Sequence, residues 1–244
     1  MAEQVADRQA PGGYFHWSRD PALGLFAVLP LWLAYEGMRW WLTPDERNGA
    51  EVLLLRELRR FDERGHLVLS ALFLVLMVAC ARSLVRRHVP WTRVVAVIAL
   101  EGTIYGLLLG PLAAAMASSA SRVLSTGAVG PALLADVVGS LGAGIFEELV
   151  FRLGLMSLLV WLGVRGARMW SLPAWSALAF GVGISAVVFS WFHHLCGEPF
   201  EQARFVFRTM AGVLLGLLMW TRGFGVCVWT HTMYNVHYYL AADG

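Results

Sequence analysis

The sequence has no lysine, little charge of either sign and no paired cysteines. All 19 basic residues are arginine, and charged residues make up only 15% of the 244 residues. A soluble domain carries about 25% charged residues. By contrast, 58% of this chain is hydrophobic and its mean hydropathy is +0.60. The scarcity of charge excludes an ordinary soluble domain and indicates a membrane protein.

The same scarcity limits the partners and metal sites that we expect. The net charge is +2, and no basic stripe lies outside the loops that flank apolar runs, so we expect no nucleic-acid partner. Cys80, Cys196 and Cys227 are an odd set without CxxC spacing. This excludes a disulfide framework and a cysteine-rich zinc site. All three lie in or beside apolar runs, and we predict that they pack in the core.

Long apolar stretches predict the fold class. Residues 102–121, 172–192 and 223–242 contain no Asp, Glu or Arg, and about twenty such residues span a hydrocarbon core of ~30 Å. We predict an all-α polytopic membrane bundle with about seven or eight membrane segments. Residues 1–130 would supply N-terminal membrane helices and residues 131–240 a second core, with no separate soluble domain. Arginines balance between adjacent connections, so the positive-inside rule assigns no topology.

The segments themselves follow from the apolar runs and their breaks. We expect membrane segments at about 21–42, 66–81, 94–116, 171–196, 209–220 and 224–240, the fifth of these short for a full crossing. Trp40 and Trp41 would anchor the first at the interface. Residues 43–65 form a polar connection whose EVLLLRELRRF stretch predicts a helix on the membrane surface. The 34 apolar residues 131–164 exceed any bilayer as one straight helix, so a break or bend is expected.

Three ionisable residues interrupt that long apolar stretch. Glu147, Glu148 and Arg152 lie within EELVFR, where each charge near a bilayer centre costs roughly 2.5–3.5 kcal/mol unless it faces protein or water. Glu148 and Arg152 are spaced i, i+4, so they share a helix face and can form an ion pair. Glu147 is rotated by about 100° and points elsewhere. The cluster therefore predicts either a packing lock between helices or a free carboxylate that acts as a base.

Two further polar groups sit on later apolar segments. His193 ends the stretch FSWFH, and His231 and Asn235 share a helix face four residues apart. An imidazole and an amide are both good donors to a developing oxyanion. Glu147 can take a proton from water that His193 helps to hold, while His231 and Asn235 stabilise a tetrahedral intermediate. His194 lies about 100° away from His193 around the helix, so this segment offers two candidate histidines.

Motifs of other intramembrane hydrolases are missing from the sequence. There is no HExxH, which excludes a zinc site built on one helix. There is also no GxSG for a rhomboid-like serine and no GxGD for a presenilin-like aspartate pair. What remains is glutamate-based chemistry, or a metal held by Glu147, His193 and His231 from separate helices.

These motifs together resemble one family. EELVFR resembles the EExxxR motif of the CPBP family, which includes the CAAX prenyl endopeptidases and their bacterial Abi relatives. Residues 189–193 resemble that family's FxxxH motif, which selects His193 over His194 because Phe189 precedes it by four residues. Residues 231–235 resemble its HxxxN motif. The resemblance covers roughly residues 131–240, and nothing specific in the first half of the chain adds to it.

The resemblance implies an intramembrane endopeptidase whose catalytic core is residues 131–240. It implies Glu147 as the base, His193 as its water-holding partner, and His231 with Asn235 as oxyanion donors. Glu148 and Arg152 would support them. No cofactor is certain, and zinc stays open. The expected partners are the lipid bilayer and a membrane-associated protein or peptide substrate, and the expected location is a bacterial inner membrane.

The resemblance allows three classes of substrate and two interpretations of the catalytic character. Prenylated CAAX tails, peptide maturation or bacteriocin immunity, and removal of a C-terminal sorting tail as in myxosortase-like members are the three classes that the resemblance allows. The competing interpretation is a non-catalytic scaffold or immunity factor of the same fold. A transporter is a weaker alternative, because no inverted repeat is visible.

Overall fold

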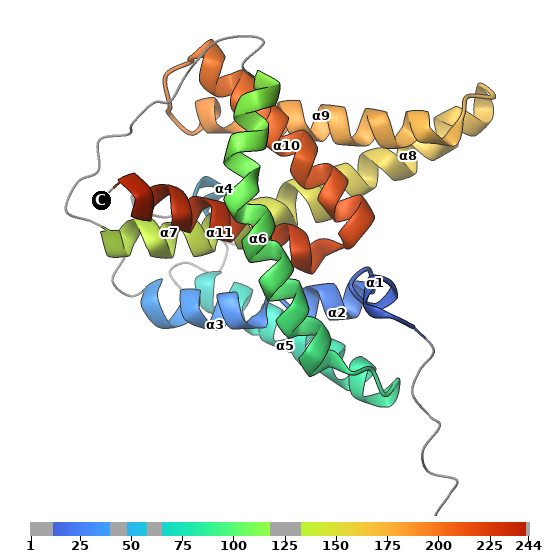
Figure 1. Ribbon diagram of the computed structural model, residues 1–244, viewed down its shortest axis with the longest axis vertical. Helices are drawn as coiled ribbons and strands as arrows, with labels where there is room; N and C mark the ends of the chain where they lie inside the picture. The colour runs from blue at the N-terminus through green and yellow to red at the C-terminus, as the bar shows by residue number, and fades with distance from the viewer. Residues whose placement is uncertain (1–11, 40–47, 58–64, 118–132, 243–244) are drawn as a thin grey trace, which may run out of the picture.

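A computed structural model describes residues 12–39, 48–57, 65–117 and 133–242, and these residues are helical with no strand. The elements are α1 Tyr14–Trp17, α2 Pro21–Phe26, α3 Leu29–Met38, α4 Gly49–Glu57, α5 Gly65–Arg86, α6 Trp91–Ala117, α7 Leu133–Glu147, η4 Glu148–Met156, α8 Ser157–Met169, α9 Ala174–Leu195, α10 Gln202–Arg222 and α11 Phe224–Ala242. Helix α6 runs along the long axis, with α3, α7 and α11 lying across it (Figure 1). The predicted all-α membrane bundle is confirmed.

Five segments within the described residues are long and apolar enough to cross a membrane. They are Pro21–Met38, Gly65–Arg86, Trp91–Ala117, Ala174–Leu195 and Gln202–Arg222. This is fewer than the seven or eight expected, because α7, η4, α8 and α11 carry the polar residues or are shorter. The predicted interfacial anchors Trp40 and Trp41 lie outside the described residues, and so does Leu58 of the predicted surface helix.

Two of the sequence-based expectations are wrong. The segment expected to be short, 209–220, belongs to the 21-residue helix α10. The uncharged run begins only at Thr209, because the early turns contain Arg204 and Arg208, whose charges pair with Glu198 in the preceding loop. Cys196 is exposed at the C-terminal cap of α9 and does not pack in the core, whereas Cys80 and Cys227 are buried as predicted.

The first membrane segment is two short helices. Asp20 caps α2 by accepting a hydrogen bond from the backbone N–H of Leu23 at 3.0 Å, and Pro21 follows at the first helical position. Pro30 stands at the start of α3, and its ring removes an N–H that a continuous helix would need. The chain therefore restarts a helix after Phe26.

Small residues let α6 and α11 approach closely. A Cβ atom at Gly102 would lie 2.4 Å from Trp229 Cβ, and one at Gly106 would lie 2.9 Å from the carbonyl oxygen of Thr230. Close approach at glycine is a common way to join membrane helices. Helix α10 also joins α6, because Arg222 of α10 donates two hydrogen bonds, at 2.6 and 2.7 Å, to Glu101 of α6. Helices from both halves of the chain thus share one interior.

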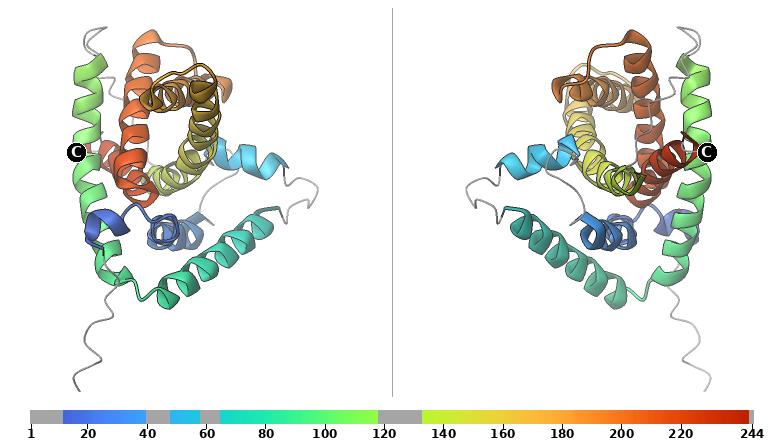
Figure 2. Two further views of the ribbon diagram at one scale, coloured as in Figure 1. Left: turned by 90° about the vertical axis from the view of Figure 1, so that its right-hand side faces the viewer. Right: turned by 90° about the vertical axis from the view of Figure 1, so that its left-hand side faces the viewer.

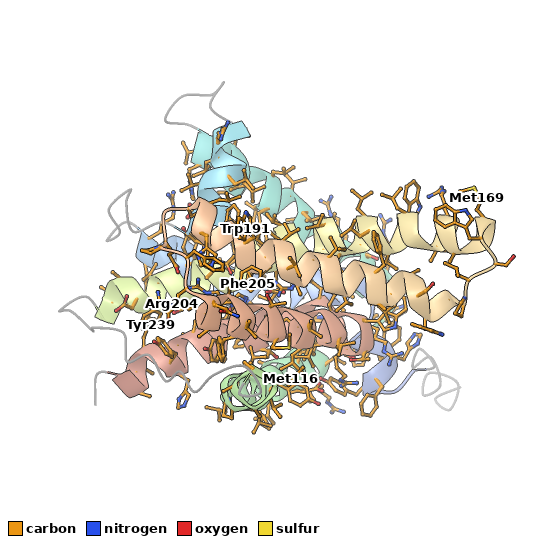
Figure 3. All side chains as sticks on the ribbon, turned by 90° about the horizontal axis from the view of Figure 1, so that it is seen from above. Met116, Met169, Trp191, Arg204, Phe205 and Tyr239 are labelled. Atoms are coloured by element: carbon orange, nitrogen blue, oxygen red, sulfur yellow. The ribbon has the colours of Figure 1, made fainter. Side chains whose placement is uncertain are left out.

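The long apolar stretch 131–164 bends, as its length requires. Helix α7 ends at Glu147, residues Glu148–Met156 form a π-helix, and α8 continues in a new direction and pairs with α9 as a projecting hairpin (Figures 1 and 3). The π-helix is rare and is frequent at functional sites. The bend therefore falls on the EELVFR motif. Gly142 and Gly144 lie before the bend, where they allow α7 to pack closely against Tyr35 and Thr232.

Replacing Gly144 by alanine is expected to destabilise the fold by about 1–3 kcal/mol. The added Cβ atom would lie 1.9 Å from Thr232 Oγ1 and 3.0 Å from Thr232 Cα, so α7 and α11 must move apart. Gly139→Ala on the same helix meets no atom within 4 Å and should be neutral or slightly stabilising. Thermal unfolding in detergent measures both. Equal effects of the two substitutions would contradict the close contact.

Candidate active site

The site begins with a buried ion pair in the π-helix. Arg152 Nη1 lies 3.1 Å from Glu148 Oε1, and the two side chains are 1% and 0% exposed. The predicted pairing of these residues is therefore present, although the helix is π rather than α. Arg152 also donates to the carbonyl oxygen of Gly212 at 3.4 Å and stacks over the Phe189 ring at 4.2 Å. These contacts fix the guanidinium between α9 and α10.

Glu148 is held by two more donors from α11. The Nδ1 atom of His231 lies 2.7 Å from Glu148 Oε1, and the Cys227 thiol donates to Glu148 Oε2 at 3.0 Å. An ionised carboxylate only accepts hydrogen bonds, so its partner assigns the proton of His231 to Nδ1. Glu148 is thus surrounded by groups that neutralise or donate to it.

Glu147 points into a different environment. Its Oε1 atom lies 3.8 Å from His193 Nε2, and its Oε2 atom lies 3.7 Å from His231 Nε2. Oε1 also accepts a hydrogen bond of 2.7 Å from the side-chain amide of Asn48. Glu147 is 4% exposed. The structure therefore brings Glu147, His193 and His231 together from α7, α9 and α11.

The two histidines present the same nitrogen to Glu147. His193 Nδ1 lies 3.0 Å from the carbonyl oxygen of Phe189, so Nδ1 carries the proton there too. In their neutral forms both rings then offer an Nε2 lone pair towards the carboxylate. Separations of 3.7 and 3.8 Å are too long for direct hydrogen bonds. The arrangement suits a molecule with two protons to donate.

His194 faces away from this group. Its Nδ1 atom lies 3.3 Å from the carbonyl oxygen of Glu198, and its ring packs against Trp191, Phe200 and Phe205. Trp191 and Phe205 lie close together where α9 ends and α10 begins (Figure 3). The structure therefore places His193, and not His194, beside Glu147.

Asn235 lies one turn beyond His231 on α11. It is partly buried, and its side chain makes no hydrogen bond to the part of the chain that the structure describes. His237 is exposed nearby. The structure thus leaves the Asn235 amide available to a ligand but does not join it to Glu147.

The residues named as metal ligands do not form a metal-binding group in this arrangement. A zinc ion needs its nitrogen and oxygen ligands about 2.0–2.2 Å away in tetrahedral directions. Among the described residues, no set of three or more His, Cys, Asp or Glu side chains is placed to hold a metal ion. We therefore derive no step through a metal.

A charged clamp holds the loop that follows His193. Arg208 of α10 donates hydrogen bonds of 2.7 and 3.0 Å to the two oxygens of Glu198. Partial burial raises the pKa of Glu198, but the hydrogen bonds from Arg208 outweigh it, so the pKa lies below its usual value. The loop carboxylate therefore stays charged and paired near the end of α9.

Fold and site together define a helical membrane protein with two buried neighbouring carboxylates, of which Glu148 is paired with an arginine and Glu147 faces two histidines. Residues 129–237 match the family model described as type II CAAX prenyl endopeptidase Rce1-like. The match covers the part of the chain that carries the three motifs and confirms their resemblance to this family of proteases. Searches of curated proteins and of solved structures found no match.

Sequence reasoning missed two residues at the site. Cys227 was expected only to pack, yet its thiol donates to Glu148. Its position four residues before His231 places it on the same helix face, which is a signal that could have been used. Asn48 was part of a polar connection, and no local pattern links it to Glu147, 99 residues later.

Arg152→Met is expected to destabilise the protein by about 3–5 kcal/mol, because it leaves Glu148 buried without its cation. The double variant Glu148→Gln with Arg152→Met removes both charges and should recover most of that loss, since the Gln oxygen still accepts from His231. Thermal unfolding in detergent, run as a double-mutant cycle, provides the measurement. A double variant as unstable as Arg152→Met would argue against the ion pair as the cause.

Proposed function

We propose that the chain is an intramembrane endopeptidase that hydrolyses a peptide bond by glutamate-activated water. The observation that carries the proposal is the convergence of Glu147, His193 Nε2 and His231 Nε2. A carboxylate kept only for packing would be expected to have a cationic partner, as Glu148 has in Arg152. Within the described residues Glu147 has no arginine partner, only two imidazoles and an amide.

The proposed reaction uses each group once. Glu147 takes a proton from a water molecule that also donates to His193 Nε2, and the water oxygen attacks the carbonyl carbon of the scissile bond. The carbonyl electron pair moves to oxygen and forms a tetrahedral oxyanion. Glu147 then returns the proton to the leaving nitrogen as the C–N bond breaks. The products are a carboxylic acid and an amine.

His231 and Asn235 are the proposed oxyanion donors. His231 Nδ1 is already committed to Glu148, so donation from Nε2 requires a proton on both ring nitrogens. Glu148 and Arg152 then act through His231 by fixing its ring. The Asn235 amide supplies the second donor, as expected from its place one turn along α11.

Glu147→Gln is expected to abolish proteolysis, a loss of at least 100-fold, because the amide cannot accept the proton of water. The measurement compares protein termini by mass spectrometry in native cells with the wild-type or variant gene. Proteins that keep an uncut terminal segment only in the variant are substrates, and the retained segment distinguishes a prenylated tail, a peptide precursor and a C-terminal sorting tail. The family and the membrane segments lead us to expect a membrane-associated substrate.

Glu201→Gln is the matched control. Glu201 lies in an exposed pair with Arg204 and outside the carboxylate cluster, so the same change of acid to amide should leave the termini as in wild type. If Glu147→Gln accumulates to normal level and leaves the terminal profile unchanged, while wild type and a gene deletion differ, the proposal fails. A non-catalytic scaffold would then account for the function.

Removing metal ions is expected to leave activity within about two-fold of the untreated enzyme, because the mechanism proposed from the donor geometry needs none. The test treats purified protein in detergent with a chelator and follows cleavage of a peptide that contains the segment retained in Glu147→Gln cells. Loss of activity that returns on adding zinc would contradict the glutamate mechanism and favour metal binding by Glu147, His193 and His231.

A further inference from the structure

Asn48 stands at the point where α4 meets the carboxylate cluster. Its Oδ1 atom accepts a hydrogen bond of 2.8 Å from the backbone N–H of Ala50, which makes it the N-terminal cap of α4. Its Nδ2 atom donates a hydrogen bond of 2.7 Å to Glu147 Oε1. The oxygen can only accept and the nitrogen can only donate, so these two partners fix the orientation of the amide.

Contacts on three sides hold α4 in place. Glu51 is fully buried, accepts a hydrogen bond from the Tyr35 hydroxyl of α3, and lies 3.3 Å from His66 Nδ1 of α5. Gly49 packs against the end of α9, where an added Cβ atom would lie 2.8 Å from the Cys196 sulfur. Helices α4 and α6 lie on opposite sides of α7 (Figure 2). Asn48 is therefore held beside Glu147 by a helix that its own contacts fix in place.

The hydrogen bond makes the two oxygens of Glu147 different. Oε1 is already an acceptor for Asn48, whereas Oε2 faces His231 Nε2 at 3.7 Å without a direct hydrogen bond. A general base must offer a free lone pair at a defined place near the proton that it removes. A donor on Oε1 stops rotation of the carboxylate and leaves Oε2 as the more available oxygen.

We propose that Asn48 is a positioning residue for the base, which fixes the Glu147 carboxylate so that Oε2 removes the proton from water. The inference rests on the proposed function. It adds a residue from outside the family match at 129–237, and it makes the start of α4 part of the site.

Three substitutions separate positioning from simple support of α4. Serine is also a good N-terminal cap but has no amide donor, so Asn48→Ser should keep the thermal stability of the protein, while kcat falls about 10-fold or more and KM stays unchanged. Asn48→Asp also keeps the cap but replaces the donor by a second carboxylate. Asn48→Ala removes the cap as well and reports the contribution of α4.

The pH profile of Asn48→Asp provides a readout that a purely structural role would not move. Two carboxylates in contact resist being ionised together, so the acidic limb of kcat/KM should move to higher pH than in Asn48→Ser. The charged or titratable groups that face this position are Glu147 of α7, Glu148 and Arg152 of η4, His193 and Cys196 at the end of α9, and His231 of α11. All of them are the same in the two variants, so the difference reports the new carboxylate.

The assay uses the full chain in detergent and a quenched fluorescent peptide that contains the segment retained in Glu147→Gln cells. Asp20→Asn is the control, because asparagine preserves the cap of α2 away from the site, and it should leave kcat unchanged. If Asn48→Ser and Asn48→Asp both have wild-type kcat and pH profile while Glu147→Gln is inactive, Asn48 has no positioning role and the proposed function stands. If Glu147→Gln is active, both fail together. If Asn48→Ser does not fold, the kcat and pH profile of Asn48→Asp provide the test.

Discussion

The charge on Glu148 is the constraint on which the arrangement of the site depends. A carboxylate that is completely buried is stable only if cations and donors surround it, because removal of one charge from water costs several kcal/mol. Here Arg152 comes from the same π-helix, and His231 and Cys227 both come from α11. The contacts that stabilise Glu148 therefore hold α11 against the bend in the chain. The orientation of the His231 ring is a consequence of that requirement.

Two neighbouring carboxylates acquire opposite character from this geometry. Glu148 faces a guanidinium, an N–H and a thiol, whereas Glu147 faces two Nε2 atoms that lie beyond hydrogen-bond distance. The proton on His231 Nδ1 links the two, since the bond to Glu148 turns Nε2 towards Glu147. Different surroundings of paired carboxylates are a general way to give them different chemical roles. Within the described part of the chain, the side-chain donor to Glu147 is Asn48, and it reaches Oε1.

The sequence predicted the parts of the site that depend on local spacing. The i, i+4 relation placed Arg152 on Glu148, and the motif spacing chose His193 over His194, in agreement with the observed contacts. The π-helix was not predicted, because a pair four residues apart remains close in either helix form. Asn48 could not be found, since its contact with Glu147 depends on how α4 is anchored by buried partners from α3 and α5. The start of α10 was not predicted either, because Arg208 interrupts the apolar run there and its pairing with Glu198 across the loop is a tertiary contact.

The placement of Asn48 argues that the first part of the chain does more than hold the second in the membrane. Its capping bond to Ala50 and its bond to Glu147 use the two ends of one amide, so a shift of α4 would move the donor and the start of the helix together. Glu51, one turn later, is buried against Tyr35 and His66, and such a carboxylate is costly to expose to lipid or to leave unpaired. The same polar contacts that stabilise α4 therefore fix a donor at Glu147. The family-matched segment supplies the other groups around that carboxylate, but not this one.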